Sequence, residues 1–151
     1  MSLDDDIAFF ERVPTLALLG REPLRILAIG AETRYIHGGE VLFNSGEEAA
    51  GGFVIQEGRF NLSSDDGRDI TVGPGTLLGE VALFTETMRP TTATALEPST
   101  VLVIPRPLFI KMLDSFPDAA RNLRDILASR LDQSAREFHN VRVALDAHEP
   151  K

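Results

Sequence analysis

The chain has 151 residues and a formal net charge of −8, and a chain of this length is expected to form one domain with a substantial core. The acidic balance disfavours direct nucleic-acid binding, which needs a basic face against the phosphates. The sequence contains no cysteine, which excludes disulfide and thiolate chemistry and fits a reducing cytoplasm, where we expect the protein. No apolar run reaches the roughly 18–20 residues that span a membrane, and the acidic start lacks the basic segment of a signal peptide.

The first part of the chain predicts short helices over residues 5–12 and 14–30. Apolar side chains recur there at helix-like spacing. Gly20 and Pro23 interrupt the second segment, so two helical pieces are expected. Gly30 is expected to cap its end. We interpret these helices as a lid on a single domain that spans residues 5–145.

Between residues 33 and 104, short β-prone runs alternate with turn signals. Asp66-Gly67 is a strong hairpin signal. Eight short strands with turns this frequent predict a mainly β fold with flanking helices, built on an eight-stranded antiparallel jelly-roll barrel. The expected strands are Thr33–His37, Val41–Phe43, Gly52–Glu57, Arg59–Ser63, Arg68–Val72, Thr76–Leu78, Arg89–Ala95 and Thr100–Ile104.

The stretch from residue 78 to residue 95 suggests the capture of a small anion. Gly79 lets the backbone approach a ligand, and residues 80–83 can form one helical turn whose free N–H groups suit a phosphate. Arg89 offers a planar fork for two phosphate oxygens. Glu80 can accept hydrogen bonds from sugar hydroxyls.

Residues 105–145 are expected to be helical again. One helix runs to about Leu113, and a long final helix runs from Pro117 to about Leu145. From Leu127 onward its apolar positions follow a heptad spacing. This seam has two interpretations, packing back over the pocket or joining a homodimer. We favour the homodimer, because the stripe reaches beyond what a small barrel can cover.

The segment Gly79-Glu80-Val81-Ala82-Leu83, followed by Arg89-Pro90-Thr91-Thr92-Ala93-Thr94-Ala95, resembles the phosphate-binding cassette of the cyclic nucleotide-binding domain family. That family includes catabolite activator protein-like regulators, kinase regulatory subunits and cyclic nucleotide-gated channels. Two further stretches, 39–47 and 53–58, resemble the family's early turn and aliphatic strand, so the resemblance covers roughly residues 7–140.

The resemblance implies a cyclic nucleotide ligand, either cyclic AMP or cyclic GMP. Glu80 would hold the ribose 2′-hydroxyl, Arg89 the cyclic phosphate, and the backbone near Gly79 and Ala82 would complete the cradle. The expected ligand-binding residues are Gly79, Glu80, Val81, Ala82, Arg89 and Thr91.

Two functions stay open. The first is a stand-alone cyclic nucleotide sensor whose C-terminal helix relays occupancy to an effector protein. The second is a dimeric interaction module with a degenerate pocket, because Pro90 stands where the family usually offers a backbone N–H to the phosphate. The sequence offers no catalytic constellation, and we expect no enzyme and no cofactor. His37, His139 and His148 lack metal-ligand spacing, so no metal site is expected.

Overall fold

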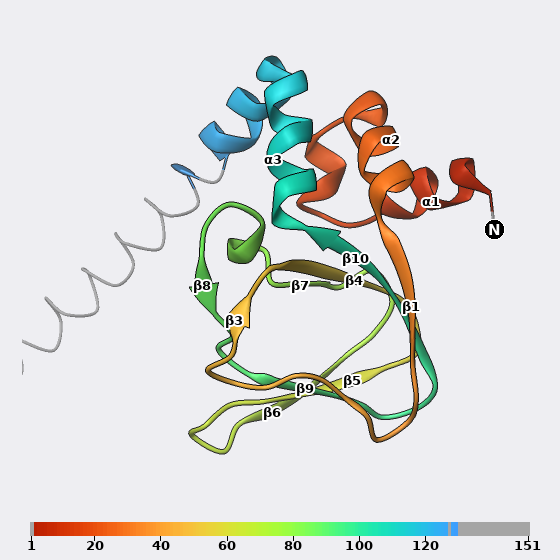
Figure 1. Ribbon diagram of the computed structural model, residues 1–151, viewed down its shortest axis with the longest axis vertical. Helices are drawn as coiled ribbons and strands as arrows, with labels where there is room; N and C mark the ends of the chain where they lie inside the picture. The colour runs from red at the N-terminus through yellow and green to blue at the C-terminus, as the bar shows by residue number, and fades with distance from the viewer. Residues whose placement is uncertain (1, 127, 130–151) are drawn as a thin grey trace, which may run out of the picture.

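Two four-stranded antiparallel sheets lie below a group of helices in the computed structural model (Figure 1), which describes residues 2–126 and 128–129. The strand orders are β1-β10-β4-β7 and β2-β9-β5-β6, and β3 pairs with β8 in a separate ribbon. The strands are β1 (Glu32–Ile36), β2 (Val41–Phe43), β3 (Glu48–Ala49), β4 (Gly51–Glu57), β5 (Phe60–Ser63), β6 (Asp69–Val72), β7 (Leu77–Leu78), β8 (Thr87–Met88), β9 (Thr92–Ala95) and β10 (Ser99–Pro105).

This arrangement is mainly β with flanking helices and is jelly-roll-like, but it corrects the expectation of one closed eight-stranded barrel. The described strands form separate sheets instead. The chain crosses between them at tight turns; Gly58, with φ +93°, leads from β4 into β5 of the other sheet. Such a turn ends one hydrogen-bonded ladder before the next begins, so side chains rather than a continuous ladder join the sheets.

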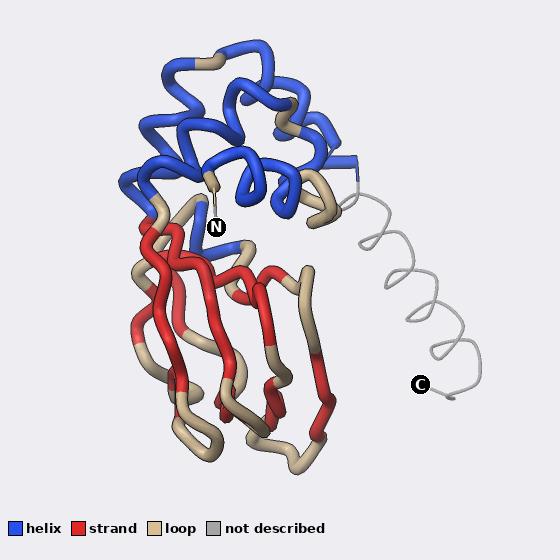
Figure 2. Tube along the Cα trace, turned by 90° about the vertical axis from the view of Figure 1, so that its right-hand side faces the viewer, coloured by secondary structure: helices blue, strands red, loops and turns tan. Residues whose placement is uncertain are grey.

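The strands β4 and β10 are buried on both faces of their sheet. Phe53 and Ile55 of β4 join an apolar cluster between the sheets, whereas Val54 joins a second cluster with the helices. Val101 and Leu102 of β10 divide in the same way. Adjacent residues of a strand point to opposite faces of the sheet. Because an apolar cluster covers each face here, β4 and β10 each contain consecutive apolar residues. Figure 2 shows the helices gathered as one layer beyond the strands.

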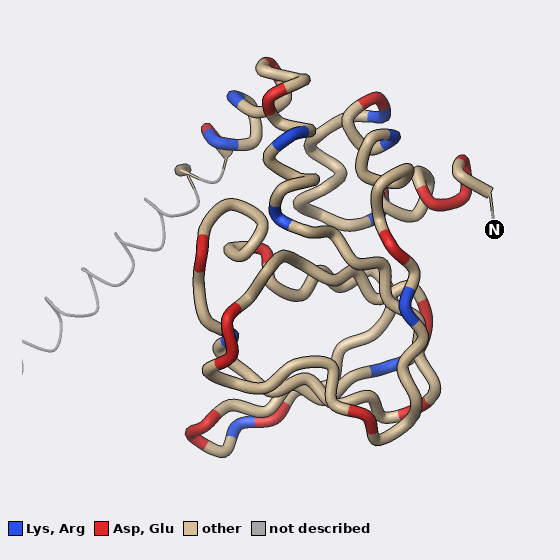
Figure 3. Tube along the Cα trace, in the orientation of Figure 1, with Lys and Arg blue, Asp and Glu red and all other residues tan. Residues whose placement is uncertain are grey.

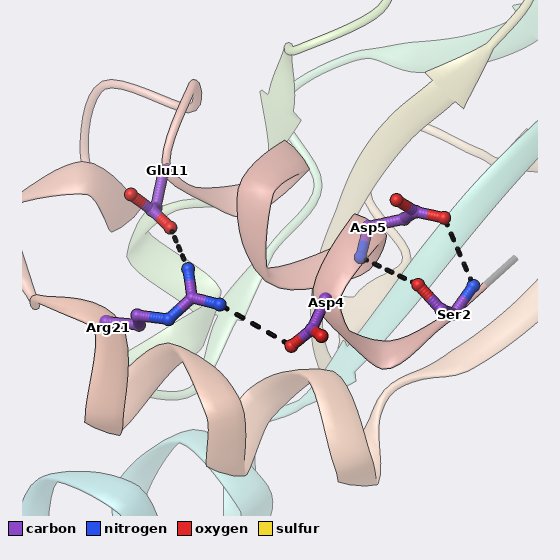
Figure 4. A network of polar contacts seen from close by, with 5 residues as sticks. All are labelled: Ser2, Asp4, Asp5, Glu11 and Arg21. Atoms are coloured by element: carbon purple, nitrogen blue, oxygen red, sulfur yellow. Dashed lines mark hydrogen bonds and ion pairs between the residues drawn. The ribbon is translucent and has the colours of Figure 1, made fainter.

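The first helix begins earlier than the sequence predicts. Ser2 is the N-cap of this helix. The Ser2 hydroxyl accepts a hydrogen bond from the Asp5 backbone N–H, and the Asp5 carboxylate accepts one from the Ser2 backbone N–H, which together form a capping box (Figure 4). Such a box satisfies two free donors at a helix start, so the helix starts at residue 3. Arg21, at the start of the helix over residues 21–30, forms ion pairs with Asp4 and Glu11 in the same network. The helices are α1 (Leu3–Phe10), the 3-10 helix η1 (Leu16–Leu18), α2 (Arg21–Gly30), the 3-10 helix η2 (Val81–Leu83) and α3 (Arg106–Ser115).

The predicted break within residues 14–30 is present, because Gly20 adopts φ +88° between η1 and α2. The prediction that Gly30 caps the helix is wrong: α2 includes Gly30, and Ala31 is the cap. A Cβ atom on Gly30 would lie 2.6 Å from Leu108 Cδ1. The glycine therefore makes room for α3 to pack against α2.

The C-terminal region is helical as far as the structure describes it. Residues 117–126 are helical, and Leu123 is buried in the cluster that joins the helices to the sheet. The rest of the predicted long helix, with the heptad positions from Leu127 to Leu145, lies outside the described residues. Within the described ranges, no helix is long and apolar enough to cross a membrane.

Candidate functional site

The predicted helical turn after β7 is present. Gly79 adopts φ +84° directly after the strand, Glu80 is the N-cap, and η2 follows. A non-glycine residue rarely adopts this left-handed conformation, so Gly79 is what lets the chain leave the sheet here. The first N–H groups of a helical turn have no acceptor within it, and they lie next to Glu80 and Gly79.

Arg89 is a buried cation with unsatisfied donors. Its side chain is 5% exposed, and Nη2 donates to the Gly51 carbonyl at 2.9 Å. In the part of the chain that the structure describes, Nε and Nη1 have no hydrogen-bond partner. The guanidinium carbon lies 4.5 Å from the ring centroid of Phe43 and 5.2 Å from that of Phe53. These aromatic faces stabilise the charge without using its N–H groups.

The electrostatic surroundings of Arg89 disfavour its charged form. Burial lowers the pKa of the Arg89 guanidinium below its ordinary value, because an apolar environment disfavours the charged form. The Glu47 carboxylate acts in the opposite direction, and the positive charge of Arg106 adds to the lowering. A bound anion would offset this burial cost.

The Arg89 guanidinium also packs directly against the backbone of Gly79. A Cβ atom at position 79 would lie 2.3 Å from Arg89 Nη1 and 3.0 Å from the Gly51 carbonyl oxygen. The guanidinium thus rests on the backbone of the turn that precedes η2. Glycine at this position is required both for the backbone conformation and for the position of the arginine.

These residues line one cavity of about 510 Å³, within the range of roughly 300–1,000 Å³ that is usual for small-molecule sites. All six residues predicted from the sequence to bind ligand lie in its wall: Gly79, Glu80, Val81, Ala82, Arg89 and Thr91. Pro90 lies there too, and most of the other lining residues are apolar: Phe43, Ala49, Leu62, Leu77, Leu78 and Met88. The cavity combines one cation, one carboxylate and an apolar wall.

Glu80 has a protein partner that the sequence did not indicate. The Thr15 hydroxyl, between α1 and α2, donates to Glu80 Oε2 at 2.7 Å. No sequence signal points to this pair, because the two residues are 65 positions apart and a threonine before a helical turn is ordinary.

Arg106 is a second residue that sequence reasoning missed. Its Nε donates to the Ala82 carbonyl of η2 at 2.9 Å, and its Nη2 donates to the Ala49 carbonyl of β3. Its backbone N–H donates to the Ala50 carbonyl at 2.9 Å. The first residue of α3 is therefore fastened to the turn that lines the cavity. Among residues 2–126 and 128–129, no group of His, Asp or Glu side chains could hold a metal ion.

Comparisons with known proteins place this geometry among related chains. Residues 33–116, more than half of the chain, match the sequence profile described as the cyclic nucleotide-binding domain. The chain is 38% identical to a cyclic nucleotide-binding-like protein from Brucella abortus bv. 1 str. 9-941, with a TM-score of 0.65 over 74% of this chain and 99% of that one. It is 29% identical to the N-terminal domain of a transcriptional regulator from Streptomyces coelicolor A3(2), with a TM-score of 0.77 over 86% and 94%.

A curated relative shows how the same segment occurs inside a much longer protein. Over 101 residues the chain is 31% identical to lysophospholipase NTE1 of Pyricularia oryzae. The matched segment covers 64% of this chain and 7% of that protein. The chain therefore spans only a small fraction of the length of that relative.

Proposed function

Because the chain belongs to the cyclic nucleotide-binding domain family, we propose that its cavity binds cyclic AMP or cyclic GMP and that the protein is a regulatory module rather than an enzyme. The observation that carries this proposal is Arg89, buried with Nε and Nη1 unpartnered at the cavity wall. A buried cation without a partner is costly, and a singly charged cyclic phosphate supplies one matching charge and two acceptor oxygens.

The other residues of the cavity suit the rest of such a ligand. Glu80 is a carboxylate acceptor for a ribose hydroxyl, and the N–H groups at the start of η2 suit phosphate oxygens. Val81 and Met88, both well exposed, border the cavity with apolar surface on which a purine could pack. Thr91 contributes a further polar side chain beside the proposed phosphate position.

A second candidate function rests on Pro90, which lines the cavity and has no N–H. If the missing donor removes binding, the domain is a dimeric interaction module with a degenerate pocket. Under either function we propose that the C-terminal helix passes the signal on, to an effector protein or across a homodimer.

The test is a calorimetric titration of wild type and Arg89→Met with cyclic AMP and cyclic GMP. Loss of one side of a buried charge pair costs roughly 2–5 kcal/mol, so Arg89→Met should bind at least about thirtyfold more weakly. Arg68→Met is the matched control, because the Arg68 side chain is 84% exposed on the β5–β6 hairpin. Absence of binding to the wild type at high micromolar concentration would favour the degenerate pocket.

Urea unfolding shows whether a non-binding variant is still folded. Arg89→Met removes a buried charge that lies over two phenylalanine rings, which relieves a cost of burial, but it also removes the donor to the Gly51 carbonyl. Because these two changes oppose each other, we expect the stability of the variant without nucleotide to lie within about 1 kcal/mol of that of the wild type. A loss of binding together with marked destabilisation would assign Arg89 a structural role instead.

A further inference from the structure

The hydrogen bond between Thr15 and Glu80 joins the N-terminal helices to the proposed ligand site. Thr15 is 4% exposed, and its hydroxyl lies 2.7 Å from Glu80 Oε2. Thr15 is also the N-cap residue of η1, so it belongs to the helical layer, whereas Glu80 lines the cavity. One carboxylate therefore contacts both the helical layer and the cavity.

The chemistry of a carboxylate allows both contacts at once. Each of its two oxygens accepts hydrogen bonds, so Thr15 on Oε2 leaves Oε1 for a second donor. A glutamate side chain rotates freely and loses that freedom when it binds. Threonine is β-branched and stiff at χ1, and the burial of Thr15 restricts it further. A fixed donor on one oxygen holds the other in a set direction before the ligand arrives.

We propose that Thr15 is the positioning residue of Glu80: it directs the free carboxylate oxygen to the ribose hydroxyl and couples the N-terminal helices to the occupied site. This inference rests on the proposed function. Ligand occupancy then tightens a continuous link from ribose to Glu80 to the residue between α1 and α2. The helical layer is in this way a part of the binding site rather than only a cover over the sheet.

The experiment compares Thr15→Val, which keeps the shape of the side chain but loses the hydroxyl, with Thr15→Ser, which keeps the hydroxyl. Each protein is titrated with the preferred cyclic nucleotide and with its 2′-deoxy analogue, which lacks the ribose donor. Thr15→Val should bind the ribonucleotide about fivefold more weakly and should bind the deoxy analogue with unchanged affinity. The reason is that only the ribonucleotide carries the 2′-hydroxyl that Glu80 would hold. Thr15→Ser should resemble the wild type for both ligands. Thr100→Val, another buried threonine at 8% exposure but outside the cavity lining, should change neither affinity.

Hydrogen exchange of residues 13–19 gives a second readout. Saturating ribonucleotide should slow exchange there in the wild type and in Thr15→Ser, and less so in Thr15→Val. Equal weakening of both ligands by Thr15→Val, no weakening of either, or equal protection in all three proteins would overturn the inference while the proposed function stands. If the wild type binds neither nucleotide, the proposed function fails and this inference fails with it.

Discussion

Arg89 carries a cost of burial that its protein partners offset only in part. Its charge is surrounded by Phe43, Phe53 and backbone, and one of its donors is used on the Gly51 carbonyl. Buried groups without partners cost free energy that a folded chain retains only for a reason. Binding sites are where such a cost is commonly found, because an arrangement suited to the ligand is unsatisfied without it.

Gly79→Ala tests whether the glycine sets the position of Arg89. An alanine at φ +84° costs roughly 1–2 kcal/mol in backbone strain, and its Cβ would also displace the guanidinium. Gly67→Ala is the matched control, because Gly67 has φ +86° with no atom within 4 Å of an added Cβ. We expect urea unfolding to show a larger loss of stability at position 79 than at position 67. Calorimetry should show about tenfold weaker nucleotide binding only at position 79. Equal losses and unchanged binding would contradict this role.

At this scale the sequence indicates the residues of the cavity better than their partners. The spacing of Gly79, Glu80 and Arg89 predicted residues that line one cavity, because a glycine-led turn and an arginine nine positions later are local features. Thr15 and Phe43 could not be predicted as neighbours of these residues. Their contacts depend on how distant segments pack, and no local pattern encodes that.

Individual elements differ in how much local signal they carry. The sequence placed β2 correctly and six other strands (β1, β4, β5, β6, β7 and β10) to within one residue at each end, but it missed the ribbon of β3 and β8. Each of those strands has two residues, too few for a period-2 pattern. The expected strand from Arg89 to Ala95 begins three residues too early, because only Thr92–Ala95 is β9. Arg89 instead bonds the turn after β2, with its N–H on the Glu47 carbonyl at 2.8 Å.

Arg106 is the residue by which α3 holds the turn beside the cavity. Arg106→Met removes the donors from two carbonyls, those of Ala82 and Ala49, and an unsatisfied buried acceptor costs about 1–3 kcal/mol. We expect the free energy of unfolding to fall by that amount and hydrogen exchange of residues 81–85 to become faster. Lys111→Met changes an exposed cation on the same helix and should alter neither. If the two variants behave alike, α3 is held to the sheets by apolar packing alone.

In the part of the chain that the structure describes, two apolar clusters share one sheet. The helices, β4 and β10 form the first cluster, and the two sheets form the second between them. The mainly β class and the flanking helices could be predicted, because hydrophobic periodicity and turn residues act locally. The separation into two open sheets could not, because strand pairing depends on segments far apart in the chain.

Asp and Glu occur in the helices, the strands and the turns of the described chain (Figure 3), and their charge opposes the association of whole molecules. With a net charge of −8, two copies repel each other unless apolar surface brings them together. The heptad spacing from Leu127 to Leu145 predicts such a surface on the final helix. Leu131→Asp puts a charge in that seam and should convert a dimer to a monomer in sedimentation velocity. Gln133→Asp adds the same charge two residues along, off the seam, and should leave the dimer intact. A monomeric wild type would contradict the predicted dimer. If Leu131→Asp stays dimeric, the dimer interface lies elsewhere on the molecule. If Leu131→Asp instead changes nucleotide affinity in a monomer, the helix packs over the cavity of its own chain.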